Sequence, residues 1–167
     1  HALGEIPVQA IDRPVAQPKV IERPRLAGFL AEDIKAGRVA VEDKVDRSVV
    51  TIRGDELFAS ASSSIVDDYQ PLMLRIADAI RKVKGQVRVT GHSDNRPIAT
   101  LRFPSNWALS EARAKSVLEI LAAKTGQGER FSAEGRSDTE PVATNATAEG
   151  RARNRRVEIT VLAEGVE

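Results

Sequence analysis

The chain has 167 residues, 41% hydrophobic and 29% charged, values typical of one soluble globular domain with a tail. Its net charge of +1 gives no overall attraction to nucleic acid or to an anionic membrane surface. The absence of cysteine excludes disulfides and thiolate metal sites. No apolar stretch approaches the roughly 20 residues of a membrane-spanning helix, and no signal peptide precedes His1. We therefore expect a soluble piece of a longer protein.

The first 24 residues are rich in proline, with Pro7, Pro14, Pro18 and Pro24 separated by short pieces. Proline at this density opposes helix formation and favours an extended linker. We therefore expect three parts: a linker over 1–24, an extension over 25–54 and a folded domain over 55–163.

The predicted extension contains one helix and a β-hairpin. Four apolar residues at helical spacing predict the helix, which ends near Gly37: Leu26, Phe29, Leu30 and Ile34. Alternating Val39 and Val41, then Val50 and Ile52, predict two strands joined by a polar turn over 43–47.

Two longer helices follow. The first is predicted to be capped by Asp67 or Asp68, to carry Pro71 in its first turn and to end before Gly85. Its apolar stripe is Leu72, Ile76, Ile80 and Val83. The second spans about 106–124 and ends at Gly126. Its apolar face is Trp107, Ala114, Val117, Leu118 and Leu121.

Three further strands are predicted at Val87–Gly91, around Phe131 and Ala133, and over Val157–Val161, with a polar loop through Thr147 before the last. A mixed β-sheet with both main helices on one face buries these apolar stripes, which predicts an α+β fold.

Three polar segments are not required by the core. Gly91-His92-Ser93-Asp94-Asn95 follows a strand, where ligand sites are common, although Asp94 and Asn95 can equally shape a turn. Asn106, Ser110 and Arg113 form a polar stripe at the start of a helix, where backbone N–H groups favour an anion. An arginine there can grip a carboxylate, while the alternative is a solvated helix edge.

The third segment, Gly150-Arg151-Ala152-Arg153-Asn154-Arg155-Arg156, has four arginines in six residues. Its plain interpretation is a solvated cap that ties down loop carbonyls. Nucleic-acid binding is not expected, because no aromatic residues are interleaved and the chain has no broad basic excess.

Together, GHSDN, SNWALSEARA and EGRARNRRVEI resemble the OmpA-like domain shared by OmpA, Pal and MotB, over roughly Asp55 to Leu162. The insertion over 96–104 resembles the MotB and type VI secretion branch. Residues 25–60 are most similar to the periplasmic C-terminal part of the TssL (DotU) family.

The resemblance implies a non-enzymatic module that binds the diaminopimelate-containing peptide stem of peptidoglycan. Asp94 matches the family's receptor for the ligand's ammonium, and Arg113 the arginine that grips its carboxylate. Asn106 matches a pocket asparagine, and Phe58 with Ala59 a pocket-lining loop. The supporting residues are Arg155, Arg156 and Ser110. The sequence departs from the common pattern at Ala59, where many relatives have Asp, and at Ser93, where Thr is usual.

The resemblance further implies a periplasmic domain of an inner-membrane-anchored protein in a Gram-negative bacterium, tethered through an upstream transmembrane helix. It anchors a type VI secretion complex to the cell wall, with other envelope subunits as partners and a homodimer left open. One alternative is a MotB-like flagellar stator domain. The other is an OmpA-like protein-interaction domain that has lost wall binding.

The residues themselves argue against catalysis. His92, Ser93 and Asp94 are adjacent, but neighbours on an extended segment point to opposite faces and do not form a triad. The only other histidine is His1, which leaves metal sites short of ligands. No enzyme activity, metal or cofactor is expected.

Overall fold

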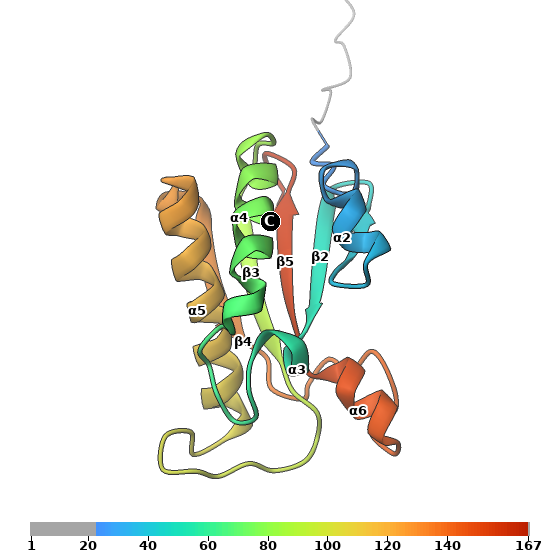
Figure 1. Cartoon of the computed structure of the whole chain (residues 1–167), viewed down its shortest axis with the longest axis vertical. Coiled ribbons are helices and arrows are strands. Elements are labelled where there is room, and N and C mark those ends of the chain that lie inside the picture. The colour runs from blue at the N-terminus through green and yellow to red at the C-terminus, as the bar shows by residue number, and fades with distance from the viewer. Residues whose placement is uncertain (1–22, 167) are drawn as a thin grey trace, which may run out of the picture.

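A five-stranded mixed sheet runs through the molecule (Figure 1). The strands are β1 (Ala40–Asp43), β2 (Arg47–Arg53), β3 (Val87–His92), β4 (Phe131–Gly135) and β5 (Arg156–Leu162), in the spatial order β1-β2-β5-β3-β4. β3 and β4 are parallel, and the other neighbours are antiparallel. The computed structural model describes residues 23–166, so nearly all of the predicted linker lies outside the described residues.

Two long helices, α4 (Gln70–Arg81) and α5 (Asn106–Thr125), cover one face of this sheet. The predicted α+β class, with two main helices on one face, is confirmed. The shorter helices are η2 (Ala27–Leu30), α2 (Ala31–Lys35), α3 (Gly54–Leu57), η3 (Asp67–Tyr69), η4 (Gly128–Arg130) and α6 (Ala148–Asn154). Within residues 23–166, no helix combines the length and apolarity needed to cross a membrane.

The core forms where the helical stripes meet the inward residues of the strands. Val50, Val89 and Ile159 are completely buried on the sheet, as are Ile76 and Leu121 on the helices. Burying each such side chain stabilises the fold by about 1.5–3 kcal/mol. Leu26 and Leu30, from the predicted extension, are buried in the same cluster, so the predicted parts 25–54 and 55–163 share one core.

Several local predictions were wrong. Trp107 is 52% exposed. The ends of β3 and β4, at Gly91 and Gly135, pack against α5 at Ser110, so the turn of α5 before Ser110 extends beyond the sheet. Phe29 and Ile34 are also exposed, at 48% and 36%. α2 is only five residues long, so the predicted four-residue stripe is not maintained over a full helix face.

The ends of two elements also differ from expectation. Neither Asp67 nor Asp68 caps α4, because these residues form the 3-10 turn η3, which leads into the helix at Gln70. The arginine-rich segment was interpreted as a solvated cap without regular structure of its own being predicted, and most of it forms α6. That helix begins where the Thr147 hydroxyl accepts a hydrogen bond from the Gly150 amide.

Candidate functional site

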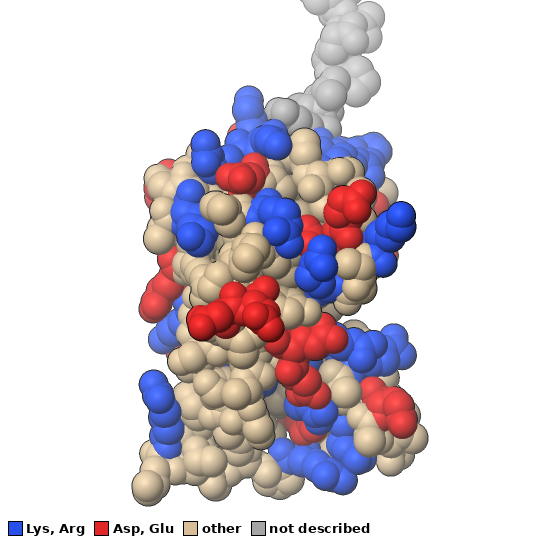
Figure 2. Space-filling model, viewed as in Figure 1, with Lys and Arg blue, Asp and Glu red and all other residues tan. Residues whose placement is uncertain are grey.

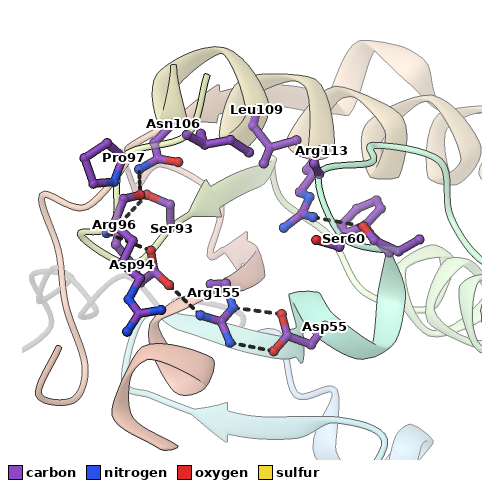
Figure 3. A pocket seen from close by; sticks show the side chains of 14 residues that line it. Asp55, Ser60, Ser93, Asp94, Arg96, Pro97, Asn106, Leu109, Arg113 and Arg155 are labelled. Carbon is purple, nitrogen blue, oxygen red and sulfur yellow. Dashed lines mark hydrogen bonds and ion pairs between the residues drawn. The ribbon is translucent and has the colours of Figure 1, made fainter. Parts of the chain in front are cut away.

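A cavity of about 540 Å³ opens at the end of β3, beside the first turns of α5 (Figure 3). It is lined by residues from four parts of the chain. They are Asp55, Phe58, Ala59, Ser60, Ala61, Ser93, Asp94, Arg96, Pro97, Ile98, Asn106, Leu109, Arg113 and Arg155. All five residues predicted to contact a ligand therefore lie around one cavity. Of the three predicted supporting residues, Arg155 lines it, while Ser110 and Arg156 do not.

Two glycines bring α5 close enough to the sheet to form this cavity. A Cβ at Gly91 would lie 2.1 Å from the carbonyl oxygen of Ser110, and one at Gly135 would lie 2.5 Å from the amide nitrogen of Glu111. Both distances are below van der Waals contact, so only glycine permits this approach. The helix is thereby held directly beside the turn that carries Asp94.

Asp94 projects into the cavity from the turn after β3 but is only 6% exposed. Its Oδ1 accepts a hydrogen bond from the Arg96 amide at 2.9 Å, and its Oδ2 accepts one from Arg155 Nη1. The carboxylate is thus fixed in direction and already paired with a cation. A carboxylate oxygen has two lone-pair positions, so each oxygen keeps capacity for a further donor.

Arg155 is held from its other side by Asp55, a residue that the sequence analysis did not single out. Arg155 Nε and Nη2 each donate to one oxygen of Asp55 at 2.8 Å, a bidentate pair (Figure 3). The hydrogen bond from Arg155 holds the pKa of the Asp55 carboxyl below its usual value, and the same contact raises the pKa of Arg155.

Arg113 reaches the cavity from the second turn of α5. Its Nε donates to the carbonyl oxygen of Ser62 at 2.8 Å and its Nη2 to that of Ala59 at 3.3 Å, while Nη1 has no hydrogen-bond partner among residues 23–166. The guanidinium carbon lies 4.8 Å from the centre of the Phe58 ring, within cation–π range. Burial of the guanidinium lowers the pKa of Arg113.

Arg113 is 8% exposed and Asp94 6% exposed. Both residues line the cavity, but most of each side chain is buried. Phe58, beneath the guanidinium, is 2% exposed. Substitutions here consequently affect packing as well as the charged lining.

The remaining predicted residues hold the surrounding chain. Asn106 donates from Nδ2 to the Arg96 carbonyl at 2.8 Å and so ties α5 to the loop after β3. Ser110 is buried below the cavity, where its hydroxyl accepts from the Ser137 amide at 3.2 Å. Arg156 points away and donates to Glu158, at 2.8 Å, and to two backbone carbonyls.

The three adjacent polar residues of the hydrolase alternative do not converge. His92 is buried on the sheet face opposite α5, where its Nε2 lies 3.5 Å from Glu158 Oε1. The Ser93 hydroxyl donates to the backbone carbonyl of Asp94 at 2.9 Å. Among residues 23–166, no group of three His, Asp or Glu side chains is placed to hold a metal ion.

The fold and the cavity define a two-layer α+β domain with a carboxylate and a guanidinium on the lining of one pocket. The chain belongs to the OmpA family, whose sequence profile matches residues 57–155. This confirms the resemblance inferred from the three motifs.

Two solved structures and one curated relative show which members of the family this chain resembles. The structure of the cell wall anchor of the T6SS (type VI secretion system) from Pseudomonas aeruginosa is 80% identical, with a TM-score of 0.83, and covers 86% of this chain and 100% of that one. The periplasmic domain of Helicobacter pylori MotB is 28% identical, with a TM-score of 0.70, over 76% of this chain and 83% of that one. The peptidoglycan-binding protein ArfA of Mycobacterium tuberculosis is 34% identical over 65% of this chain and 32% of its own length.

The chain spans about a third to a half of the length of the curated relatives it matches. The higher identity to the T6SS anchor agrees with the resemblance to the type VI secretion branch.

Proposed function

We propose that this domain binds peptidoglycan non-covalently, taking the free end of diaminopimelate into the cavity between Asp94 and Arg113. The observation that carries the proposal is the presence of these two opposite charges on one cavity lining. The free end of diaminopimelate bears an ammonium and a carboxylate, so a carboxylate and a guanidinium provide both orientation and attraction. The unpaired Nη1 of Arg113 is available to the ligand carboxylate.

The proposed biological role is to anchor an inner-membrane type VI secretion complex to the cell wall from the periplasm. The 80% identity to a T6SS cell wall anchor supports this role over a MotB-like stator role, for which the identity is 28%. The upstream membrane helix and the envelope partners are part of this proposal. No bond is broken in the proposed role, so incubation with sacculi is expected to release no soluble muropeptides.

The second candidate function is that of a protein-interaction domain that has lost wall binding, and a specific contact favours it. Asp94 is already paired with Arg155, and position 59 carries Ala in place of the Asp of many relatives. An ammonium must share or replace an existing cation at Asp94. A domain with these features can serve protein contacts alone.

Co-sedimentation with purified sacculi tests the wall-binding proposal. Wild-type protein is expected to sediment, whereas Asp94→Asn and Arg113→Lys are expected to bind at least about 30-fold more weakly. The first leaves the ligand ammonium without a carboxylate, and the second keeps a cation but loses the bidentate grip on the ligand carboxylate. Lys124→Gln, an exposed change at the far end of α5, is the matched control. Retention of both cavity variants would reject this cavity, and failure of the wild type would favour the second candidate.

We also propose the division into a linker over 1–24 and a folded unit over 25–163. Residues 25–54 share the core with the rest, so both predicted parts of that unit should melt together. Limited proteolysis should remove the Pro-rich segment and leave a fragment with a single melting transition. Two transitions, or loss of cooperativity after trimming, would reject the division.

A further inference from the structure

The second face of the sheet, opposite α4 and α5, is polar and carries many charges. Strand register places its residues in rows across the strands. One row is Glu42, Val49, Thr160, Arg88 and Ser132, and the next is Ala40, Thr51, Glu158, Thr90 and Glu134. A third row brings together Arg53, Arg156 and His92. We call this surface the open face.

Two adjoining hollows cross the open face, of about 560 and 190 Å³, and share Lys44, Val49 and Glu158 in their linings. Eight basic residues line them: Arg38, Lys44, Arg47, Arg53, Arg88, Arg136, Arg153 and Arg156. Only four acidic residues do so: Glu42, Glu134, Glu140 and Glu158. The open face is therefore a local excess of positive charge on a chain whose net charge is only +1.

Three of these arginines have no hydrogen-bond or ion-pair partner among residues 23–166: Arg53, Arg88 and Arg153. The others are paired, as Arg47 is with Asp46 at 2.9 Å and Arg136 with Glu134 at 3.0 Å. Arg53 lies directly opposite Arg156 on the neighbouring strand, but Arg156 is buried and already paired with Glu158 at 2.8 Å. Arg53 is therefore the cation of this row that is left for an external anion.

A buried histidine lies in the lining of the smaller hollow. His92 is 3% exposed, and neither ring nitrogen has a hydrogen-bond partner among the residues described. Its closest carboxylate oxygen, on Glu158, is 3.5 Å from Nε2, which is long for a hydrogen bond. Both nitrogens are enclosed by protein, so a ligand on the open face would contact the arginines around this ring rather than the ring itself.

We propose that the open face binds an extended acidic segment of a partner protein. The unpaired arginines do not converge on one point, which argues against a single small anion. Arg53 is opposite Arg156 and Arg88 is opposite Thr160. These two positions on β5 are four residues apart, about 13 Å at about 3.3 Å per residue. Carboxylates at a similar spacing on an extended chain can pair with both arginines.

Two other anionic surfaces fit less well. A membrane is flat, whereas the open face is hollowed and includes four glutamates that anionic headgroups would repel. The face has no Phe, Tyr or Trp in its lining for stacking with nucleobases, and the ring of His92 is buried.

A second copy of this chain is the main competing occupant. Figure 2 shows acidic side chains gathered across the opposite, helical side, over α3 and the turn η3 that precedes α4. These elements carry Asp55, Glu56, Asp67 and Asp68. Such a contact would join different surfaces of successive copies and produce open-ended assembly rather than a closed dimer. The experiment below separates it from a partner segment.

No residue lines both the open face and the Asp94 cavity, so this inference is independent of wall binding. The test uses the full chain and a fluorescent peptide of about ten residues that alternates Glu and Ser, with a Gln-for-Glu peptide as the neutral control. Anisotropy should show binding of the acidic peptide only, weakened as salt is raised to about 0.15 M.

The informative variant is Arg88→Gln with Arg153→Gln, which removes two unpaired cations. Arg53 is left unchanged because it is two residues from Asp55, which lines the Asp94 cavity. Its matched control is Lys115→Gln with Lys124→Gln on exposed positions of α5, which removes the same charge. The open-face variant should bind the acidic peptide about tenfold more weakly, and the control should bind like the wild type. Both should melt at the wild-type temperature.

Equal losses in the two variants, or equal binding of the neutral peptide, would overturn the proposal. Stronger binding to vesicles with anionic lipid, lost in the same open-face variant, would assign the surface to a membrane instead. Concentration-dependent self-association in sedimentation velocity, lost in that variant, would assign it to a second copy.

Discussion

The guanidinium of Arg155 donates a hydrogen bond to the carboxylate of Asp94, although the two residues are 61 positions apart in the chain. The ligand-free cavity therefore contains an internal cation where the proposed ligand places its ammonium. Asp55 keeps that cation in position through two hydrogen bonds of 2.8 Å. Binding of an ammonium at Asp94 consequently requires the carboxylate to accept from both cations or Arg155 to turn towards Asp55.

Arg155→Gln should lower the free energy of unfolding by about 2 kcal/mol, because it leaves the buried Asp94 carboxylate without its cation. Arg153→Gln is the matched control: it lies two residues earlier, is exposed and has no partner among residues 23–166. Urea titration of both variants measures the difference. Similar stabilities of the two variants would show that the Asp94 ion pair contributes little.

Arg113 combines a structural and a binding role, and two substitutions separate them. Arg113→Ala leaves the carbonyls of Ser62 and Ala59 without their donor and removes the contact with Phe58, so a loss of about 2–3 kcal/mol is expected. Arg113→Lys keeps the charge but loses the fork geometry. It should cost less stability and still bind sacculi poorly. Normal sacculus binding by the lysine variant would show that charge alone is sufficient.

Gly91→Ala should destabilise the domain by about 2–3 kcal/mol, because the added Cβ would lie 2.1 Å from the Ser110 carbonyl oxygen. The helix must move away from the sheet, which also displaces Arg113 relative to Asp94. Gly28→Ala is the control, since a Cβ there meets nothing within 4 Å. Thermal melts should separate the two variants clearly. Equal melting temperatures would mean that α5 shifts at little cost.

Much of this architecture follows from residue patterns that are local in sequence. Period-two alternation identified the inward residues of β2 and β5, and helical periodicity with a following glycine located α4 and α5. The exposure of Trp107 was not predictable in this way, because it depends on where the parallel strands β3 and β4 end relative to α5. Periodicity describes a helix face but not the extent of the surface it packs against.

The candidate site was likewise predicted where the signal is local in sequence and missed where it depends on a distant contact. The motif resemblance placed Asp94, Asn106 and Arg113 correctly around one cavity, since each lies in a short recognisable segment. Asp55 was missed because its role depends on a contact with Arg155, 100 positions away. A lone acidic residue in a short segment has no local pattern that reveals such a partner.

Acid should destabilise the domain partly through Glu158. Its neighbours His92 and Arg156 lower the pKa of the Glu158 carboxyl from 4.5 to about 2. Because the folded-state pKa is the lower one, the stabilisation is fully present above about pH 5 and is lost as the pH falls towards 2. It amounts to about 2 kcal/mol for this partly exposed group. Glu158→Gln should flatten the dependence of unfolding free energy on pH in this range. An unchanged slope would show that other carboxyls carry the effect.

Ala59→Asp tests whether the departure at this position weakens wall binding. Ala59 is exposed at the cavity lining, which bears two carboxylates and three guanidiniums: Asp55, Asp94, Arg96, Arg113 and Arg155. A third carboxylate offers the ligand ammonium an additional partner that is not already paired. Because an exposed pair contributes up to about 1 kcal/mol, sacculus binding should strengthen about threefold to fivefold. Ala59→Asn introduces a side chain of the same shape as Asp but without its charge, and it should bind sacculi like the wild type. Neither change should shift the melting temperature appreciably. Weaker binding by the aspartate variant would instead mean that the new carboxylate pairs with Arg113 and withdraws it from the ligand. In that case the cavity would be best balanced with alanine at this position.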